Sequence, residues 1–284
     1  MPGVGIAVFL TVQTPEATEQ TEIHISVFAS AMISPNPKGG HHMQAIQATN
    51  LVKRYGDVTA LDGLDLQVNR GELYSLLGVN GAGKTTAIRL LTGLTKPTSG
   101  DALVGGHSIT AEPGKVKSHI GVSPQETAVA PNLTVKENLE LICGIHGFSR
   151  EKTEAKIREL SARFALEPVL KRKAGKLSGG WQRRVSIAMA LISEPEILFL
   201  DEPTLGLDVL ARHELWDTIR ALKGRVTILL TTHYMEEAAA LSDRIGILKN
   251  GRLLAAGTVA ELKAMANAED FETAFVTIVK EALV

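Results

Sequence analysis

The chain has 284 residues, of which 44% are hydrophobic and 21% charged, and its 30 Lys and Arg residues nearly balance 31 Asp and Glu residues, for a formal net charge of −1. A length of this order fits one or two domains, and a nearly neutral charge provides no basic field for broad binding of nucleic acid or of an anionic membrane. We therefore expect a globular protein without a nucleic-acid partner.

The chain contains one cysteine, Cys143. It cannot form a disulfide within the chain or build a thiolate metal site alone, which is typical of a protein from a reducing compartment. We expect an ordinary buried thiol. The longest apolar runs, 226–230 and 245–248, are far shorter than the roughly 18 to 20 residues that a membrane-spanning helix needs. The sequence therefore predicts no membrane span.

Residues 1–42 differ in composition from the rest of the chain. They are rich in Thr, Ser, Pro and Glu and contain no Lys or Arg before Lys38. The apolar stretch at 6–12 lacks the basic residues that precede it in a secretory signal. We expect a disordered extension, or the product of a start codon chosen too early, with the folded protein over 43–284.

Segments with strand character begin after Met43. Runs 46–56 and 59–78 have the pattern of consecutive strands, and the second ends in the nearly all-apolar LYSLLG, as expected of a strand buried in a sheet. A glycine-rich turn and a helical stretch at 85–94 follow. The order is therefore strand, glycine loop, helix.

The middle of the chain is helical in character. Apolar residues recur at spacings of three and four from 134 to about 172, with Glu and Lys on the other face. A further helix is expected after the LSGG sequence at 177–180 and runs to about Ile192. These segments predict an inserted helical subdomain over about 126–192.

Two apolar strands, 196–203 and 225–233, follow with a helix at about 210–222 between them. This alternation predicts a parallel sheet with helices packed on it. The run 244–257 predicts a β-hairpin with an Asn-Gly turn. One or two helices are expected in a C-terminal tail over about 258–284.

Residues 78–85 read GVNGAGKT and match the phosphate-loop pattern G-x-x-x-x-G-K-[ST]. Glycines allow a tight turn that points consecutive N–H groups at an anion, and the following helix adds its dipole. Lys84 is expected to reach the β- and γ-phosphates, and the Thr85 hydroxyl to coordinate Mg²⁺. The predicted nucleotide-binding residues are Gly78, Val79, Asn80, Gly81, Ala82, Gly83, Lys84, Thr85 and Thr86.

The apolar strand at 196–203 ends in two carboxylates, Asp201 and Glu202. We expect this strand beside the one that precedes the glycine loop, so that both acids reach the sheet edge where open α/β folds bind phosphate ligands. Asp201 would hold Mg²⁺, mainly through water, and Glu202 would orient and polarise the attacking water. Strand-end acids that are only solvated are the alternative.

With these motifs in this order, the chain resembles the nucleotide-binding subunit of an ABC transporter over about residues 45–260. The resemblance implies an α/β fold with a P-loop NTPase (RecA-like) core, an antiparallel β subdomain and an inserted α-helical subdomain. It also implies ATPase activity, with ATP and Mg²⁺ bound. The matching motifs are Tyr55 in KRYG, the phosphate loop, Gln125 in SPQE, LSGG at 177–180, ILFLDEP at 197–203, LGLD at 205–208 and TTH ending at His233.

Three of these positions resemble residues that contact the nucleotide within one subunit. Tyr55 is similar to the aromatic residue that stacks on adenine. Gln125 is similar to the lid-loop glutamine that senses Mg²⁺ and the attacking water and links the ATPase core to the helical subdomain. His233 is similar to the switch histidine that contacts the γ-phosphate and positions the water. We therefore expect Glu202, His233, Gln125 and Lys84 to carry catalysis.

The remaining motifs resemble those that act across a dimer. Ser178, Gly179 and Gly180 are similar to the signature segment, whose hydroxyl and N–H groups contact the γ-phosphate held by the other subunit. Asp208 is similar to the acid that communicates between subunits. The resemblance implies an ATP-driven head-to-tail dimer with a second copy, bound through a separate transmembrane permease subunit to the cytoplasmic face of the cell membrane.

Trp181 stands where the family usually has Gln after LSGG. The export-type branch that handles drugs, antibiotics, nodulation factors or polysaccharides often differs here, and TTHYMEEA at 231–238 is similar to that branch. We therefore expect the ATPase subunit of an exporter. Trp181 stacks near the ribose or packs against the partner subunit; the sequence does not choose between these.

Two other classes of ABC protein are the alternatives. A soluble ATPase of the repair or translation type would carry long coiled coils or a second cassette, and the sequence has neither. A regulatory module that binds ATP without hydrolysing it would ordinarily have lost Lys84, Glu202 or His233.

Overall fold

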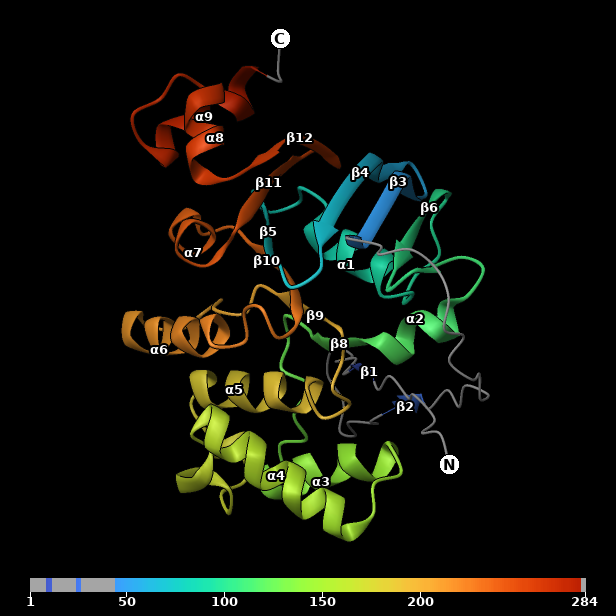
Figure 1. The fold of residues 1–284 in the computed structure, drawn as a ribbon, viewed down its shortest axis with the longest axis vertical. Coiled ribbons are helices and arrows are strands. Elements are labelled where there is room, and N and C mark those ends of the chain that lie inside the picture. Colours follow the sequence, from blue (N-terminus) through green and yellow to red (C-terminus); the bar gives the residue numbers. More distant parts are fainter. Residues whose placement is uncertain (1–8, 12–23, 27–43, 282–284) are drawn as a thin grey trace.

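The computed structural model describes residues 9–11, 24–26 and 44–281 (Figure 1). Within the segment expected to be a disordered or spurious extension, Phe9–Thr11 (β1) pairs antiparallel with His24–Ser26 (β2). The rest of residues 1–42 lies outside the described part of the chain, so that expectation stays a prediction.

The centre of the molecule is a six-stranded sheet. Its strands are Leu73–Leu77 (β5), Ile120–Ser123 (β8), Ile197–Asp201 (β9), Thr227–Thr232 (β10), Arg244–Lys249 (β11) and Arg252–Gly257 (β12). Their order is β12–β11–β5–β10–β9–β8, and only the hairpin pair β11–β12 is antiparallel in this sheet. The predicted parallel sheet and the predicted hairpin are therefore confirmed.

The strand β10 lies between β5 and β9, so the prediction that the acidic strand adjoins the phosphate-loop strand was wrong. Sequence order does not fix the order of parallel strands, because a crossover connection can leave room for a later strand. Thr231 of β10 is in register with Leu76 on one side and Asp201 on the other. The inserted strand thus brings Thr231 to the edge where the acids lie.

A second, four-stranded antiparallel sheet has the order β4–β3–β6–β7 within the described residues. The run 59–78 forms two strands, one in each sheet, because the chain turns at Gly71 with φ of +73°. The helix after the glycine loop ends at Leu91, before Gly93 with φ of +66°. These elements are Gln44–Tyr55 (β3), Val58–Asn69 (β4), Lys84–Leu91 (α1), Ser99–Val104 (β6), His107–Ser108 (β7) and Pro113–His119 (α2).

Three α-helices and two short 3₁₀ turns lie between β8 and β9. The region from 134 to about 172 contains two helices, which are separated at Gly147 with φ of +68°. The second ends at Ala165 in the left-handed conformation, before the predicted limit of about 172. The helix expected after LSGG already begins at Gly179, with Ser178 as its N-cap. The elements here and after β9 are Val135–Ile145 (α3), Arg150–Phe164 (α4), Glu167–Val169 and Ala174–Lys176 (3₁₀), Gly179–Ala190 (α5) and Val209–Arg220 (α6).

Hydrophobic cores lie on both faces of the six-stranded sheet. Side chains alternate between faces along a strand: Leu198 and Leu200 pack with α3 to α6, whereas Phe199 packs with α1 and the antiparallel sheet. The helices α1 and α5 therefore cover opposite faces of the sheet (Figure 1). Cys143 belongs to the first core and is fully buried, as predicted.

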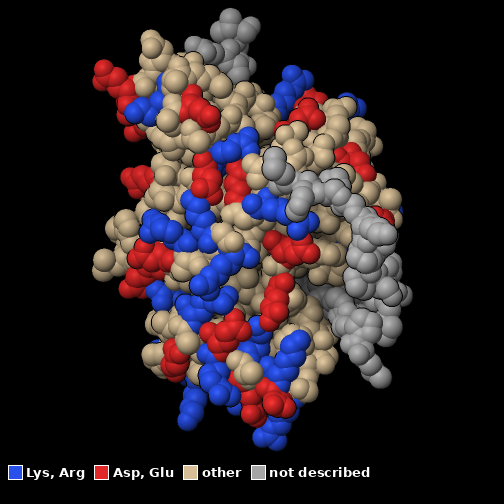
Figure 2. Space-filling view, in the orientation of Figure 1, with Lys and Arg blue, Asp and Glu red and all other residues tan. Residues whose placement is uncertain are grey.

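A smaller third core joins β11 and β12 to the last helices. These are Met235–Leu241 (α7), Val259–Met265 (α8) and Phe271–Glu281 (α9). In the part of the chain that the structure describes, no helix has both the length and the apolar character that a bilayer crossing demands. On the face shown in Figure 2, basic and acidic side chains are interspersed.

Candidate active site

The glycine loop between β5 and α1 has the backbone of a phosphate loop. Gly81 and Gly83 have φ of +81° and +106°, a region that residues with a Cβ rarely adopt. A Cβ atom on Gly78 would collide with Leu248 O, and one on Gly83 would lie 2.5 Å from Ala60 O. Glycine is therefore required where other backbone passes close by. The other predicted residues of the loop and first turn are Val79, Asn80, Ala82, Lys84, Thr85 and Thr86.

The ammonium group of Lys84 turns back into this loop. Its Nζ donates to Gly78 O at 2.8 Å and to Val79 O at 3.2 Å. It also forms an ion pair with Glu202 Oε1 at 3.1 Å. Lys84 is 5% exposed, and a buried ammonium needs such partners to offset its lost hydration.

Asp201 lies buried at the end of β9, among hydroxyl groups. Its Oδ1 accepts hydrogen bonds from Thr231 Oγ1 and, at 3.4 Å, from Thr85 Oγ1. Burial raises the pKa of Asp201, and the two hydroxyls act in the opposite direction. The ion pairs of Lys84 and His233 both go to Glu202, and among the described residues no cation pairs with Asp201. A buried carboxylate beside a hydroxyl suits a hard divalent cation such as Mg²⁺.

Glu202 is held in a strained backbone conformation. Its φ of +45° lies in the left-handed region, which costs a non-glycine residue about 1–2 kcal/mol. Its N–H donates to Thr231 O and Thr231 Oγ1, both at 3.1 Å. The carboxylate is thereby directed between Lys84 and His233, whose Nδ1 lies 3.2 Å from Oε2.

The ring of His233 lies at the open side of this cluster. The approach of its Nδ1 to Glu202 does not have hydrogen-bond geometry, so this buried nitrogen has no hydrogen-bond partner among the described residues. The ring packs against Tyr234, with ring centres 4.1 Å apart. The structure thus brings together Lys84, Thr85, Asp201, Glu202 and His233, with one buried polar atom, His233 Nδ1, left without a hydrogen bond.

Tyr55 and Gln125 lie on the surface outside this cluster. Tyr55 ends β3, is 44% exposed and has Lys53 Nζ 4.9 Å from its ring centre. Gln125 lies in the loop between β8 and α3 with an exposed side chain. Neither residue contacts the cluster directly through a hydrogen bond among the described residues.

The residues expected to act across a dimer lie at two exposed helix N-termini. Ser178 caps α5, but its hydroxyl makes no capping hydrogen bond. Asp208 caps α6 and accepts from Ala211 N at 2.9 Å. Gly179 and Gly180 form the first turn of α5, and a Cβ on Gly180 would lie 3.2 Å from the Cβ of Ala211. The glycines therefore let the two helix ends pack closely.

Trp181 packs within its own chain. It lies against the core formed by α3 to α6, and the Arg184 guanidinium lies 5.0 Å from its ring centre. Arg184 also pairs with Glu214 of α6. The side chain therefore adds to the packing between α5 and α6.

Thr231 and Glu237 were not predicted as parts of this region. Thr231 reaches Asp201 through the parallel register of β10 with β9, for which the sequence carries no signal. Glu237 of α7 is fully buried and accepts from Trp216 Nε1 at 3.0 Å; burial raises the pKa of its carboxyl. Helical spacing from the buried Leu241, four residues later, places Glu237 on the inner face.

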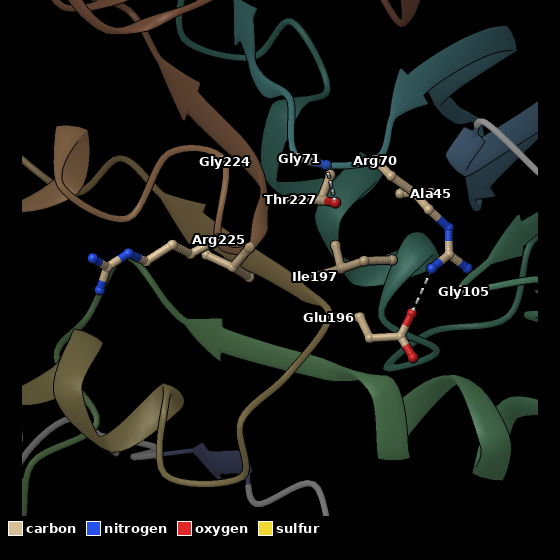
Figure 3. A pocket seen from close by; sticks show the side chains of 10 residues that line it. Ala45, Arg70, Gly71, Gly105, Glu196, Ile197, Gly224, Arg225 and Thr227 are labelled. Atoms are coloured by element: carbon tan, nitrogen blue, oxygen red, sulfur yellow. Dashed lines mark hydrogen bonds and ion pairs between the residues drawn. The ribbon is translucent and has the colours of Figure 1, made fainter.

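A pocket of about 210 Å³ lies at the opposite edge of the sheet, at the amino ends of β5, β9 and β10 (Figure 3). Arg70 pairs there with Glu196 at 3.2 Å, and Gly71 N donates to Thr227 Oγ1 at 3.0 Å. The Arg225 guanidinium points away from these groups (Figure 3). The pocket's polar groups satisfy one another, and the cluster around Lys84 is the candidate site.

Known proteins provide an independent comparison. The profile of the ABC transporter family matches residues 61–205. The daunorubicin resistance ATP-binding protein DrrA3 of Streptomyces coeruleorubidus is 46% identical over 221 residues, covering 78% of this chain and 70% of that protein. The Nod factor export ATP-binding protein I of Burkholderia lata is 42% identical over 213 residues, covering 75% of this chain and 70% of that protein.

Solved structures agree with this relationship. The ATP-binding subunit of an ABC transporter has a TM-score of 0.74 and 30% identity, covering 83% of this chain and 99% of that one. A dimeric ATP-binding cassette in a post-hydrolysis state with ADP and Pi has a TM-score of 0.68 and 28% identity, covering 75% of this chain and 98% of that one. The predicted P-loop NTPase fold is confirmed. The chain belongs to the ABC transporter family and is one of its nucleotide-binding, ATP-hydrolysing subunits.

Proposed function

We propose that this chain hydrolyses ATP in a head-to-tail dimer with a second copy of itself and powers export through a separate membrane permease. The observation that carries the proposal is that α1 and α5 cover opposite faces of one sheet, while Ser178 at the start of α5 is exposed with an unused hydroxyl. Such a segment can complete a triphosphate site of another copy, as helix N-termini do for anions.

Within one copy, the phosphate loop and Lys84 bind the β- and γ-phosphates, and Tyr55 stacks on the adenine. Thr85 and Gln125 would hold Mg²⁺ with hydroxyl and amide oxygens, and Asp201 would hold it mainly through water. When bound, the ion neutralises charge on the phosphate oxygens. The buried Asp201, without a cation of its own among the described residues, supports this ligand set.

Hydrolysis is an in-line attack of water on the γ-phosphorus, which breaks the bond to the β-phosphate and yields ADP and phosphate. Glu202 orients this water and accepts its proton, as the triphosphate draws Lys84 away from the carboxylate. His233 contacts the γ-phosphate through its otherwise unsatisfied ring. From the second copy, Ser178, Gly179 and Gly180 contribute donors to the same phosphate, and Asp208 links the two sites.

The names of the relatives support export. They include proteins for daunorubicin resistance and Nod factor export. In this proposal residues 43–284 form the ATP-binding domain, with a helical subdomain over about 126–192 and a tail over about 258–284. The dimer lies at the cytoplasmic face of the membrane, attached through the permease.

Size-exclusion chromatography of Glu202→Gln tests the dimer. The variant should bind ATP but not activate water, so the closed dimer should accumulate with ATP and Mg²⁺. Glu167→Gln, an exposed control, should turn ATP over and elute as a monomer at steady state. A Glu202→Gln chain that binds ATP and stays monomeric would contradict the proposed dimer.

Affinity purification from membranes tests the transport assignment. The tagged chain should co-purify in detergent with a protein that has about six apolar spans. Recovery only with ribosomes or repair complexes would favour the soluble class of ABC ATPase instead.

A further inference from the structure

One side of α5 is joined to the loop after β8 by a continuous row of polar contacts. The residues on α5 lie at spacings of one and three, and their partners run from Ser123, the last residue of β8, into the loop that carries Gln125. We call this row the α5 seam. It joins Ser186 Oγ to Ser123 Oγ at 2.9 Å, Arg183 to Pro124 O and Gln125 O, and Gln182 Oε1 to Thr127 Oγ1 at 3.4 Å.

Arg183 is the central member of the α5 seam. It is 4% exposed, and its Nη1 and Nη2 donate to the carbonyl oxygens of Pro124 and Gln125. Among the described residues no carboxylate forms an ion pair with it. Burial lowers the pKa of Arg183 to about 10, so the group stays charged at neutral pH. The two peptide carbonyls accept its hydrogen bonds, and the negative charges of Asp201 and Glu237 nearby favour the charged form.

The planar guanidinium fixes both carbonyls in one geometry, which a lysine ammonium cannot do. Because the two peptides are consecutive, the backbone on either side of Gln125 cannot rotate without moving Arg183. The side chain of Gln125 is exposed, but the position of its backbone is set by the hydrogen bonds to Arg183 of α5.

The same helix carries Ser178 at its exposed end. Arg183 is five residues further along, so the two lie only about 7.5 Å apart along the helix axis. Their separation is rigid, since α5 is continuous from Gly179 to Ala190 and packs on the sheet through its apolar residues. Any displacement of Ser178 therefore displaces the attachment of Gln125.

We propose that Arg183 is a positioning residue. Because of it, Ser178 binds the partner's nucleotide and Gln125 takes its place at the chain's own nucleotide in a single movement. The inference rests on the proposed dimer and on the proposed role of Gln125. It adds that one buried guanidinium carries the coupling between the two sites.

Steady-state ATP hydrolysis of Arg183→Met and Arg183→Lys tests this inference. Arg183→Met should lower kcat about tenfold or more and bring the Hill coefficient towards one, while the Kd for ATP changes by less than about threefold. Arg183→Lys keeps the charge but not the paired donors, and should be intermediate. Arg158→Met, an exposed control on α4, should change none of these values.

A second measurement separates positioning from packing. If Arg183 acts through Gln125, then Arg183→Met should lower kcat little further in a Gln125→Ala background. Independent, multiplying losses would overturn the inference, as would a lower Tm with unchanged kcat and Hill coefficient. If Arg183→Met does not fold, Arg183→Lys and Ser186→Ala provide the same comparison.

Failure of the coupling inference can also be distinguished from failure of the proposed function. The double variant Arg183→Met with Glu202→Gln should still form the ATP-bound dimer, with slower closure. If Glu202→Gln alone remains monomeric, the proposed dimer fails. If it dimerises and Arg183→Met hydrolyses ATP like the wild type, only the coupling inference fails.

Discussion

Lys84 Nζ lies 3.1 Å from Glu202 Oε1, so the lysine of the phosphate loop and the acid at the end of β9 form one buried ion pair. Their side chains are only 4% and 9% exposed, and water screens this pair little. A triphosphate in the loop competes with Glu202 for the same ammonium. Nucleotide binding and release of the carboxylate for catalysis are therefore electrostatically linked.

Replacing Lys84 by alanine should abolish function at the loop. Without the ammonium, the β- and γ-phosphates lose their nearest cation, and we expect ATP hydrolysis to fall by at least about a hundredfold. The rate should be measured with purified protein at saturating ATP. Lys171→Ala, at an exposed lysine, is the matched control. Undiminished hydrolysis in Lys84→Ala would remove the phosphate-loop assignment.

Tyr55 should contribute to nucleotide affinity rather than to the chemical step. Stacking of a base on an aromatic ring is worth about 1–3 kcal/mol, so Tyr55→Ala should raise the Kd for ATP about fivefold or more. Tyr55→Phe keeps the ring and should bind like the wild type. Calorimetric titration of both variants checks this. Equal affinity in all three proteins would show that adenine lies elsewhere.

Two glycines of the same loop should respond differently to alanine. A Cβ on Gly78 collides with the Leu248 carbonyl, whereas one on Gly81 meets no atom within 4 Å and only the positive φ opposes it. We expect Gly78→Ala to destabilise the fold by more than about 2 kcal/mol and Gly81→Ala by about 1 kcal/mol. Urea unfolding gives both values. The reverse ranking would be incompatible with this loop geometry.

Glu237 should make the stability depend on pH. Burial raises the pKa of Glu237 above its ordinary 4.5, so the folded state binds this proton more tightly than the unfolded state does. The contribution of Glu237 to the stability is greatest below pH 4.5 and is lost as the pH rises through the pKa of this carboxyl in the folded state. Glu237→Gln removes this titration and can still accept from Trp216.

The free energy of unfolding of wild type and Glu237→Gln should therefore be compared at about pH 5 and about pH 8. The free energy of unfolding of the wild type, relative to that of the variant, should be higher at the lower pH than at the higher pH. Glu236→Gln, whose side chain is exposed, should show no such change. A difference that is the same at both pH values would mean that Glu237 is already charged in the folded protein.

Local patterns were sufficient to predict the phosphate loop and most of the elements, but none was expected between 95 and 133, where β6, β7, α2 and β8 lie. Gly83 and Lys84 are adjacent in the sequence, and the strand and helix around them have clear apolar periodicity. The clustering of Asp201 and His233 at one edge also followed, because both end parallel strands. Helix ends could be predicted less precisely. The helix α5 was expected after the LSGG sequence but begins within it, because Ser178 is its N-cap.

Contacts between distant segments could not be predicted in this way. The insertion of β10 between β5 and β9 depends on how all the crossover helices pack, and it brought Thr231 to Asp201. The sequence predicted no role for Arg183. Its burial is decided by the carbonyls of Pro124 and Gln125, 59 and 58 residues away along the chain.

The burial of Cys143 has a practical consequence. It is the chain's one cysteine, it is fully enclosed, and burial raises the pKa of its thiol, so little thiolate is present at neutral pH. A fluorophore on an introduced surface cysteine, for example at Lys171→Cys, would react almost without background. Approach and separation of two labelled copies during turnover can then be followed by energy transfer in an otherwise native protein.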